Sequence, residues 1–213
     1  IQFFFDIHNI LLENFLKKRI FAQLPFEPNT DQKELIDKLS LFMTQRGERP
    51  CFVMTGYAGT GKSSVTGALV RALNEMQVPF VLLAPTGRAA KVLAHYSGFS
   101  AYTVHKCIYR RENTMGEHFQ LGWNTMHDTW FIVDEASMIS ADRDSESFGS
   151  GSLLDDLIHF VFQNPEHHCR LMLIGDGAQL PPVGHTISPA LDIEFLTGYG
   201  LEIEHATLTE VVR

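Results

Sequence analysis

The sequence has little positive charge for a protein of 213 residues. It contains 17 Lys and Arg against 25 Asp and Glu, which leaves a net charge of −8. A protein that coats DNA non-specifically is normally basic, because it must neutralise phosphates. We therefore do not expect this chain alone to bind duplex DNA strongly. Its basic residues do cluster locally, at Arg88, Lys91, Lys106, Arg110 and Arg111.

Cysteine is also scarce. The three residues, Cys51, Cys107 and Cys169, are far apart and odd in number. Their spacing excludes a disulfide framework and does not match a zinc site. The pattern predicts free thiols in a reducing compartment, and hence a cytoplasmic protein.

Long hydrophobic runs are absent. No stretch approaches the ~20 apolar residues that a membrane helix needs, so no membrane span is predicted. The apolar start, residues 1–5, is too short for a signal peptide. Because the chain begins with Ile rather than Met, we treat it as a fragment. Its length suits one large domain, or a core with a small insertion.

Short apolar runs alternate with segments of helical periodicity. Unbroken apolar runs are typical of strands that are buried on both faces of a parallel sheet. They predict strands over 51–55, 78–84, 129–133, 171–175 and 201–208. Apolar residues three and four apart predict helices over 7–20, 31–46, 62–76, 88–96 and 153–163, with Thr30 capping the second. The fold class is therefore α/β, a parallel β-sheet with helices on both faces.

The segment 56–63 reads GYAGTGKS and matches G-x-x-x-x-G-K-[ST] in full. A buried strand precedes it and a helix follows, as in a P-loop that cradles phosphates with backbone amides. Lys62 would reach the β- and γ-phosphates, and Ser63 would ligate Mg²⁺. The sequence thus predicts ATP and Mg²⁺ as cofactors. The predicted nucleotide-binding residues of this segment are Gly56, Ala58, Gly59, Thr60, Gly61, Lys62, Ser63 and Ser64.

Polar residues follow two other predicted strands. Asp134 and Glu135 end the run FIV, and Asp176 and Gln179 follow the run LMLIG. The carboxyl ends of parallel strands meet at one edge, where ligands bind in open α/β folds. Asp134 would hold Mg²⁺ through water, Glu135 would orient or deprotonate the attacking water, and Gln179 would contact that water or the γ-phosphate. Without the P-loop these residues would be ordinary solvated strand ends.

Five motifs occur in an order that resembles superfamily 1 helicases. They are YAGTGKSS, APTGRAAKVL (84–93), TVHK (103–106), VDEASMIS (133–140) and GDGAQLPPVG (175–184). The sequences of these motifs are similar to those of the RecD-like, 5′-to-3′ branch, which includes the Dda-type enzymes. The resemblance covers 26–213 and implies a RecA-like, P-loop NTPase motor domain that acts on single-stranded DNA. Residues 1–25 would be a separate N-terminal helical segment.

The resemblance implies further roles for individual residues. Gln32 matches an adenine-reading glutamine, with an exposed residue at a helix start as the ordinary alternative. Thr86 and Arg88 match a motif that grips the DNA backbone. Thr103 and His105 match a second strand-contacting motif. Arg88 as a plain surface residue and His105 as a packed histidine are the ordinary alternatives.

The last residues, LTEVVR, resemble the start of the next helicase motif. There Arg213 would reach the γ-phosphate and join Lys62, Glu135 and Gln179 as a catalytic residue.

The stretch 111–128 lies where this branch inserts a small duplex-splitting pin, and we expect a small β-hairpin or loop. Its Phe119 and Trp123 would either stack on a base or cover the core.

Helicases of this type have two RecA-like motor domains, and this sequence carries the motifs of the first only. We expect the parent chain to contain the second, and the fragment alone to be weak or inactive. The predicted function is a DNA-dependent ATPase of a helicase in replication, recombination or repair. A P-loop ATPase or kinase unrelated to DNA, and a nucleotide-binding regulatory module, remain the alternatives. The oligomeric state stays open.

Overall fold

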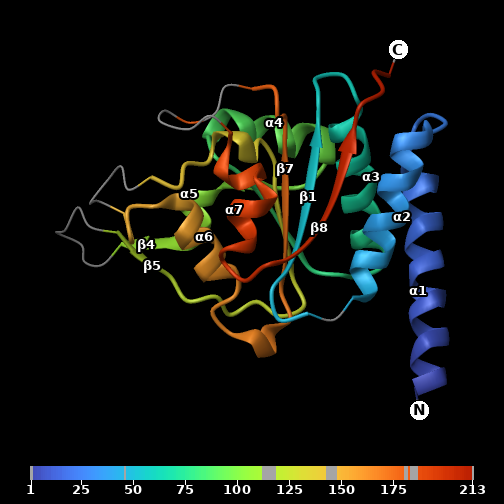
Figure 1. The fold of residues 1–213 in the computed structure, drawn as a ribbon, viewed down its shortest axis with the longest axis horizontal. Coiled ribbons are helices and arrows are strands. Elements are labelled where there is room, and N and C mark those ends of the chain that lie inside the picture. The colour runs from blue at the N-terminus through green and yellow to red at the C-terminus, as the bar shows by residue number, and fades with distance from the viewer. Residues whose placement is uncertain are drawn as a thin grey trace.

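A six-stranded parallel sheet forms the centre of the protein (Figure 1). The computed structural model describes residues 2–45, 47–111, 119–142, 148–179, 182 and 187–212. The strand order is β3-β2-β6-β7-β1-β8, and every neighbouring pair is parallel. The strands are β1 (Pro50–Gly56), β2 (Phe80–Ala84), β3 (Ala101–Thr103), β6 (Trp130–Val133), β7 (Arg170–Gly175) and β8 (Glu202–Leu208). The predicted α/β fold class is confirmed.

Side chains of the central strands alternate between two hydrophobic cores, one on each face of the sheet. In β1, Cys51 and Val53 enter one core, whereas Phe52 and Met54 enter the other. Both faces are covered, so neither set of side chains meets water. This double burial explains why the strands read as unbroken apolar runs.

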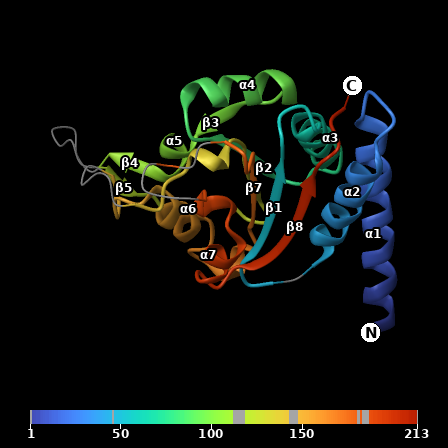
Figure 2. The ribbon, with the colours of Figure 1, turned by 45° about the horizontal axis from the view of Figure 1, so that its top comes forward.

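Helices cover the sheet on both faces (Figures 1 and 2). One core includes side chains of α5 (Val104–Ile108), α6 (Leu153–Val161) and α7 (Ile193–Thr197). The other includes side chains of α1 (Gln2–Gln23), α2 (Thr30–Thr44), α3 (Lys62–Glu75) and α4 (Gly87–Ser97). Short 3₁₀ turns lie at Ala136–Met138, Pro165–His167 and Pro189–Leu191. Within the described residues, no helix is long and apolar enough to cross a membrane.

The predicted cap of α2 is wrong by one residue. Asn29, not Thr30, is the N-cap, and its side chain accepts a hydrogen bond from the Gln32 amide at 2.9 Å. The Gln32 side chain accepts in return from the Asn29 amide at 3.2 Å. This reciprocal capping box satisfies two helix-start donors, which a Thr30 cap would not do.

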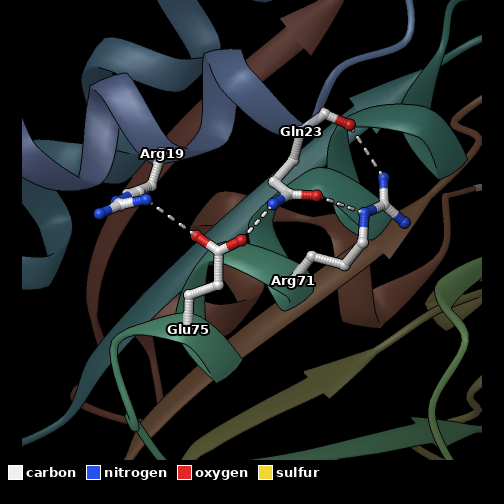
Figure 3. Close-up of polar contacts among 4 residues, drawn as sticks. All are labelled: Arg19, Gln23, Arg71 and Glu75. Carbon is white, nitrogen blue, oxygen red and sulfur yellow. Dashed lines mark hydrogen bonds and ion pairs between the residues drawn. The ribbon is translucent and has the colours of Figure 1, made fainter.

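Helix α1 packs against α2 and α3 and buries Leu16 and Ile20 completely. Figure 3 shows the polar contacts that join its end to α3. Gln23 donates to Glu75, and Arg71 donates to the Gln23 side chain and to its backbone carbonyl, each at 3.1 Å. Arg19 lies 3.5 Å from Glu75. The N-terminal segment is thus packed onto the helix that begins at the P-loop.

A small antiparallel hairpin, β4 (Tyr109–Arg111) and β5 (Phe119–Leu121), extends from the end of the molecule opposite α1 (Figure 1). The small β-hairpin expected in 111–128 is confirmed, with β4 ending at the first residue of that stretch and β5 inside it, while 112–118 lie outside the described residues. Phe119 stacks on Phe148 at 4.7 Å between ring centroids, so it covers neighbouring side chains. Trp123 is 68% exposed.

The polar loop 142–152 is described at its two ends only, because 143–147 lie outside the described residues. Its second end is tied to the hairpin. Phe148 pairs with Phe119 in an isolated bridge, and the Gly149 amide donates to the Phe119 carbonyl at 2.9 Å. The loop therefore supports β5, a role that its Gly/Ser-rich composition did not suggest.

Candidate nucleotide pocket and DNA-contacting surface

The predicted site residues gather at the carboxyl edge of the sheet. The P-loop follows β1, Asp134 follows β6 and Asp176 follows β7. Thr86 lies just beyond β2, and Thr103 is the last residue of β3. Parallel strands put all these positions at one edge, as open α/β sheets do for their ligands.

A pocket of about 400 Å³ lies at this edge. Its lining comprises Phe26, Tyr57, Ala58, Gly59, Gly61, Lys62, Ser63, Ser64, Asp134, Glu135, Asp176, Gln179 and Val212. A larger hollow, about 610 Å³, lies beside the starts of β1, β7 and β8 and contains none of the predicted residues. We take the smaller pocket as the site, because it brings together the P-loop and the residues after β6 and β7.

The P-loop backbone curves because two glycines adopt left-handed conformations, with φ of 81° at Gly59 and 92° at Gly61. The Lys62 ammonium donates to the carbonyls of Gly56 at 2.5 Å and Tyr57 at 3.0 Å, so it lies against the inside of the loop. Helix α3 begins at Lys62, and its unpaired amides favour an anion. This arrangement fits a nucleotide phosphate, to which Lys62 would transfer its bonds.

Gln32 lies behind the P-loop and is fully buried. Its Nε2 donates to the Thr60 carbonyl at 3.1 Å, and a Cβ at Gly61 would come within 2.4 Å of the same nitrogen. Because Oε1 already serves the capping box, both ends of the amide are hydrogen-bonded inside the chain. The exposed-residue alternative is therefore wrong. Contact with adenine stays a prediction and would require one of these bonds to be exchanged.

The Asp134 carboxylate is held at both oxygens. It accepts from the Glu135 amide at 3.0 Å and from the Tyr96 hydroxyl at 2.8 Å. Burial raises the pKa of Asp134, and these two bonds oppose the rise. Burial, with the nearby Asp134 charge, also raises the pKa of Tyr96, so its hydroxyl stays protonated and remains a donor.

Glu135 and Gln179 contact each other directly. Gln179 Nε2 donates to Glu135 Oε2 at 3.2 Å, and its Oε1 accepts from the Ser137 hydroxyl at 2.9 Å. Glu135 itself has a left-handed backbone, with φ of 54°. Asp176 accepts from the Ala178 amide at 2.9 Å, which closes the turn that carries Gln179. The base candidate and the predicted γ-phosphate sensor are thus hydrogen-bonded to each other.

The pocket also fits Mg²⁺. This ion usually binds one or two carboxylates together with substrate phosphates, rather than a full protein cage. Asp134 and Ser63 both line the pocket and supply a carboxylate and a hydroxyl. No group of three or more His, Cys, Asp or Glu that could hold a metal occurs in the described part of the chain. An ion that arrives with the nucleotide suits this donor set.

The predicted DNA-contacting residues lie beyond the neighbouring strands β2 and β3. Thr86 caps α4 by accepting from the Ala89 amide, and Thr103 caps α5 by accepting from the Lys106 amide, both at 3.2 Å. Arg88 is exposed on the first turn of α4.

His105 is half-buried and packs against the rings of Tyr109 and Phe148, with centroids 5.8 Å and 5.3 Å away. Burial lowers the pKa of His105, so the imidazole is neutral at neutral pH. The packing accords with the ordinary alternative for this residue. A contact of His105 with DNA stays a prediction.

The last described residues are tied to the nucleotide pocket. Asp31 accepts from the Thr209 amide at 2.7 Å, the Thr209 hydroxyl at 2.6 Å and the Glu210 amide at 3.1 Å. The Val212 amide donates to the Gly59 carbonyl at 2.9 Å. Arg213, predicted to reach the γ-phosphate, lies outside the described residues.

Several residues at this edge were missed by the sequence reasoning. Ser137 stands inside a recognised motif, where a hydroxyl two residues after Glu135 was the available signal. Phe26 and Asp31 flank the start of α2 and carried no pattern of their own. Tyr96 lies on a helix that was assigned to DNA contact, and nothing in the sequence joins it to Asp134.

Comparison with known proteins accords with this geometry. Residues 27–213 match the family described as an AAA domain. The chain is 30% identical over 157 residues to the ATP-dependent RecD2 DNA helicase of Deinococcus radiodurans, covering 73% of this chain and 19% of that protein. It is 28% identical over 165 residues to the ATP-dependent DNA helicase dda of Enterobacteria phage T4, covering 75% of this chain and 34% of that protein. It therefore spans about a third or less of the length of these relatives.

The fold also has a counterpart among solved structures. A crystal structure of Pif1 helicase from Candida albicans superposes with a TM-score of 0.54 at 18% sequence identity. The match covers 88% of this chain and 41% of that chain. At this level of identity the likeness concerns the fold. Helix α1 precedes the residues that match the family.

Proposed function

The chain belongs to the AAA domain family and is homologous to the RecD2 and Dda helicases over most of its length, and on this premise we propose that it is the ATP-hydrolysing first motor domain of a DNA helicase. One observation carries the proposal. Lys62 of the P-loop, Asp134 and Glu135 after β6, and Gln179 after β7 line a single pocket. A phosphate-binding loop facing a linked acid and amide suits water attack on a γ-phosphate.

Each residue has a distinct part in this reaction. Lys62 neutralises charge on the β- and γ-phosphates, and the glycines let the backbone amides approach them. Glu135 orients the attacking water or takes its proton, and Gln179 contacts the γ-phosphate or that water. Mg²⁺, held by Ser63 and Asp134, would offset charge on the phosphates. Arg213 would stabilise the transition state from the opposite side.

Single-stranded DNA would cross the carboxyl edge at Thr86, Arg88, Thr103 and His105. We propose 5′-to-3′ movement, on the resemblance to the RecD-like branch, and a second motor domain that completes the site. The relatives are long enough to hold one, since this chain covers 19% and 34% of them. A cytoplasmic role in replication, recombination or repair follows the same resemblance, and the described cysteines are free thiols as such a compartment requires.

The test is ATP hydrolysis by the protein that carries this domain, with and without oligothymidylate, together with binding of a fluorescent ATP analogue to the chain itself. Lys62→Ala should lower DNA-stimulated turnover roughly 100-fold or more, because it removes a charge that stabilises the transition state. Lys18→Ala is the matched control, since Lys18 is an exposed lysine on α1, outside the family match.

Two results would overturn the proposal in different ways. A chain that binds no nucleotide, or binds it equally well after Lys62→Ala, would refute the nucleotide site. Turnover that ignores DNA would refute the helicase reading and favour a P-loop enzyme of another kind. A 5′-tailed and a 3′-tailed duplex, compared in an unwinding assay, would decide the direction.

A further inference from the structure

Tyr96 joins two parts of the proposed site that the motifs treat separately. It lies near the end of α4, the helix whose first turn carries Arg88 and whose cap is Thr86. Its hydroxyl donates to Asp134 Oδ2 at 2.8 Å. Asp134 is 38 positions away in the sequence and directly follows β6.

The course of α4 makes this contact possible. In Figures 1 and 2 this helix lies along the top of the molecule, and its Leu93 and Tyr96 belong to the core that α3 also covers. It packs against α3 as well as β2 and β3. A Cβ at Gly67 of α3 would lie 3.4 Å from the Tyr96 carbonyl, so a glycine stands where the two helices approach.

Tyr96 therefore contacts Asp134, one of the two residues that the proposed function assigns to Mg²⁺. A group that hydrogen-bonds a metal ligand fixes the ligand's orientation, and its loss typically lowers metal affinity 10–100-fold. A rigid helix connects this contact to the DNA-contacting turn at Thr86 and Arg88. If α4 moves when DNA binds, the Tyr96 hydroxyl would move away from Asp134 or closer to it.

We propose that Tyr96 is a positioning residue that orients Asp134 for Mg²⁺ and couples the DNA-contacting end of α4 to the nucleotide pocket. The inference rests on the proposed function and deepens it. It adds a residue that none of the five motifs singles out for this role. The bond needs only the hydroxyl, so Tyr96→Phe removes it and keeps the ring, which packs against the hydrophobic core on that face of the sheet.

The experiment is a Mg²⁺ titration of fluorescent ATP-analogue binding to the chain. In Tyr96→Phe the Mg²⁺ midpoint should rise about tenfold, whereas binding in EDTA should equal wild type. Tyr199→Phe is the matched control, because it removes another phenol–carboxylate bond, to Asp155 on α6, away from the pocket. A merely structural role would weaken binding with and without Mg²⁺ alike, and thermal unfolding of both variants checks that they fold.

An unchanged Mg²⁺ midpoint in Tyr96→Phe would overturn the positioning role. For the coupling, oligothymidylate should shift the wild-type midpoint several-fold and leave that of Tyr96→Phe unmoved. Equal shifts in both proteins, or none in wild type, would overturn the coupling. Failure of the proposed function looks different: wild type would then bind no nucleotide at any Mg²⁺ concentration.

Discussion

The proposed nucleotide pocket and the proposed DNA-contacting surface share one edge of the sheet but are built differently. In the pocket, Gln179 bonds both Glu135 and Ser137, and both oxygens of Asp134 accept hydrogen bonds. At the surface, Thr86 and Thr103 accept bonds from the starts of their own helices, while Arg88 is exposed. Pocket residues are fixed by contacts between strands, and surface residues by the helix that carries each one.

This difference has consequences for function. A pocket whose side chains already hold one another loses little conformational entropy when the ligand binds, and its geometry matters closely. A surface of exposed side chains acts through charge, and salt screens it. Substitutions in the pocket should therefore change chemistry steeply, whereas those on the surface should change affinity gradually.

The steepest effect is expected at Glu135. Glu135→Gln keeps an oxygen that can accept from Gln179 but removes the base, so turnover should fall about 100-fold or more while nucleotide affinity stays within about twofold. Steady-state ATPase rates and analogue binding measure the two quantities. Glu166→Gln, at an exposed glutamate in the 3₁₀ turn before β7, is the control. Equal turnover in wild type and Glu135→Gln would show that the pocket is not the catalytic centre.

A moderate effect is expected at Arg88. Arg88→Ala should weaken binding of single-stranded DNA several-fold and reduce the slope of log affinity against log salt by about 1. Nucleotide binding should not change. Fluorescence anisotropy of labelled oligothymidylate across a salt series measures this. Arg88→Lys should keep the salt slope, and Lys18→Ala should behave as wild type. A slope unaltered in Arg88→Ala would exclude this side chain from phosphate contact.

Most of the fold could be predicted because strands buried on both faces consist of consecutive apolar residues, which are recognisable in the sequence. The strands β1, β2, β6, β7 and β8 all correspond to predicted apolar runs. The missed strand, β3, has three residues and pairs only with β2 at the edge of the sheet, so Tyr102 at its centre is exposed. The missed α7 is five residues long, too short to show a helical period. Elements this small are specified by their neighbours.

The same reasoning applies to the site. Residues such as Lys62 and Glu135 were found because their chemistry belongs to a local pattern. Tyr96, Ser137 and Asp31 act on partners 38, 42 and 178 positions away, respectively. Such pairs leave no local pattern, since their contact exists only once the strands are side by side. Sequence motifs thus predicted the candidate reacting groups, and the structure shows which side chains hold them in place.

The smallest effect is expected at Asp31, which attaches the last described segment to the start of α2. Bonds from Thr209, chiefly from its hydroxyl, lower the pKa of Asp31 below its ordinary value of 3.8. A carboxylate with a lowered folded-state pKa stabilises the folded state above its ordinary pKa, and this contribution is lost as pH falls through the lowered value. The attachment should therefore be intact at neutral pH and released only in acid.

The amide NMR signals of Thr209 and Glu210 should report this release. In wild type they should shift together in one titration step below pH 3.8, and Asp31→Asn should abolish the step. Overall stability at neutral pH should change little in the variant, because a half-buried carboxylate at the surface contributes little to stability. Asp37→Asn, at an exposed aspartate of α2 that pairs with Lys17, should leave the titration of both amides intact. If the two amides titrate unchanged in Asp31→Asn, another group holds the segment that leads to Arg213. Asp31 would then not be the residue that fixes this segment beside the pocket.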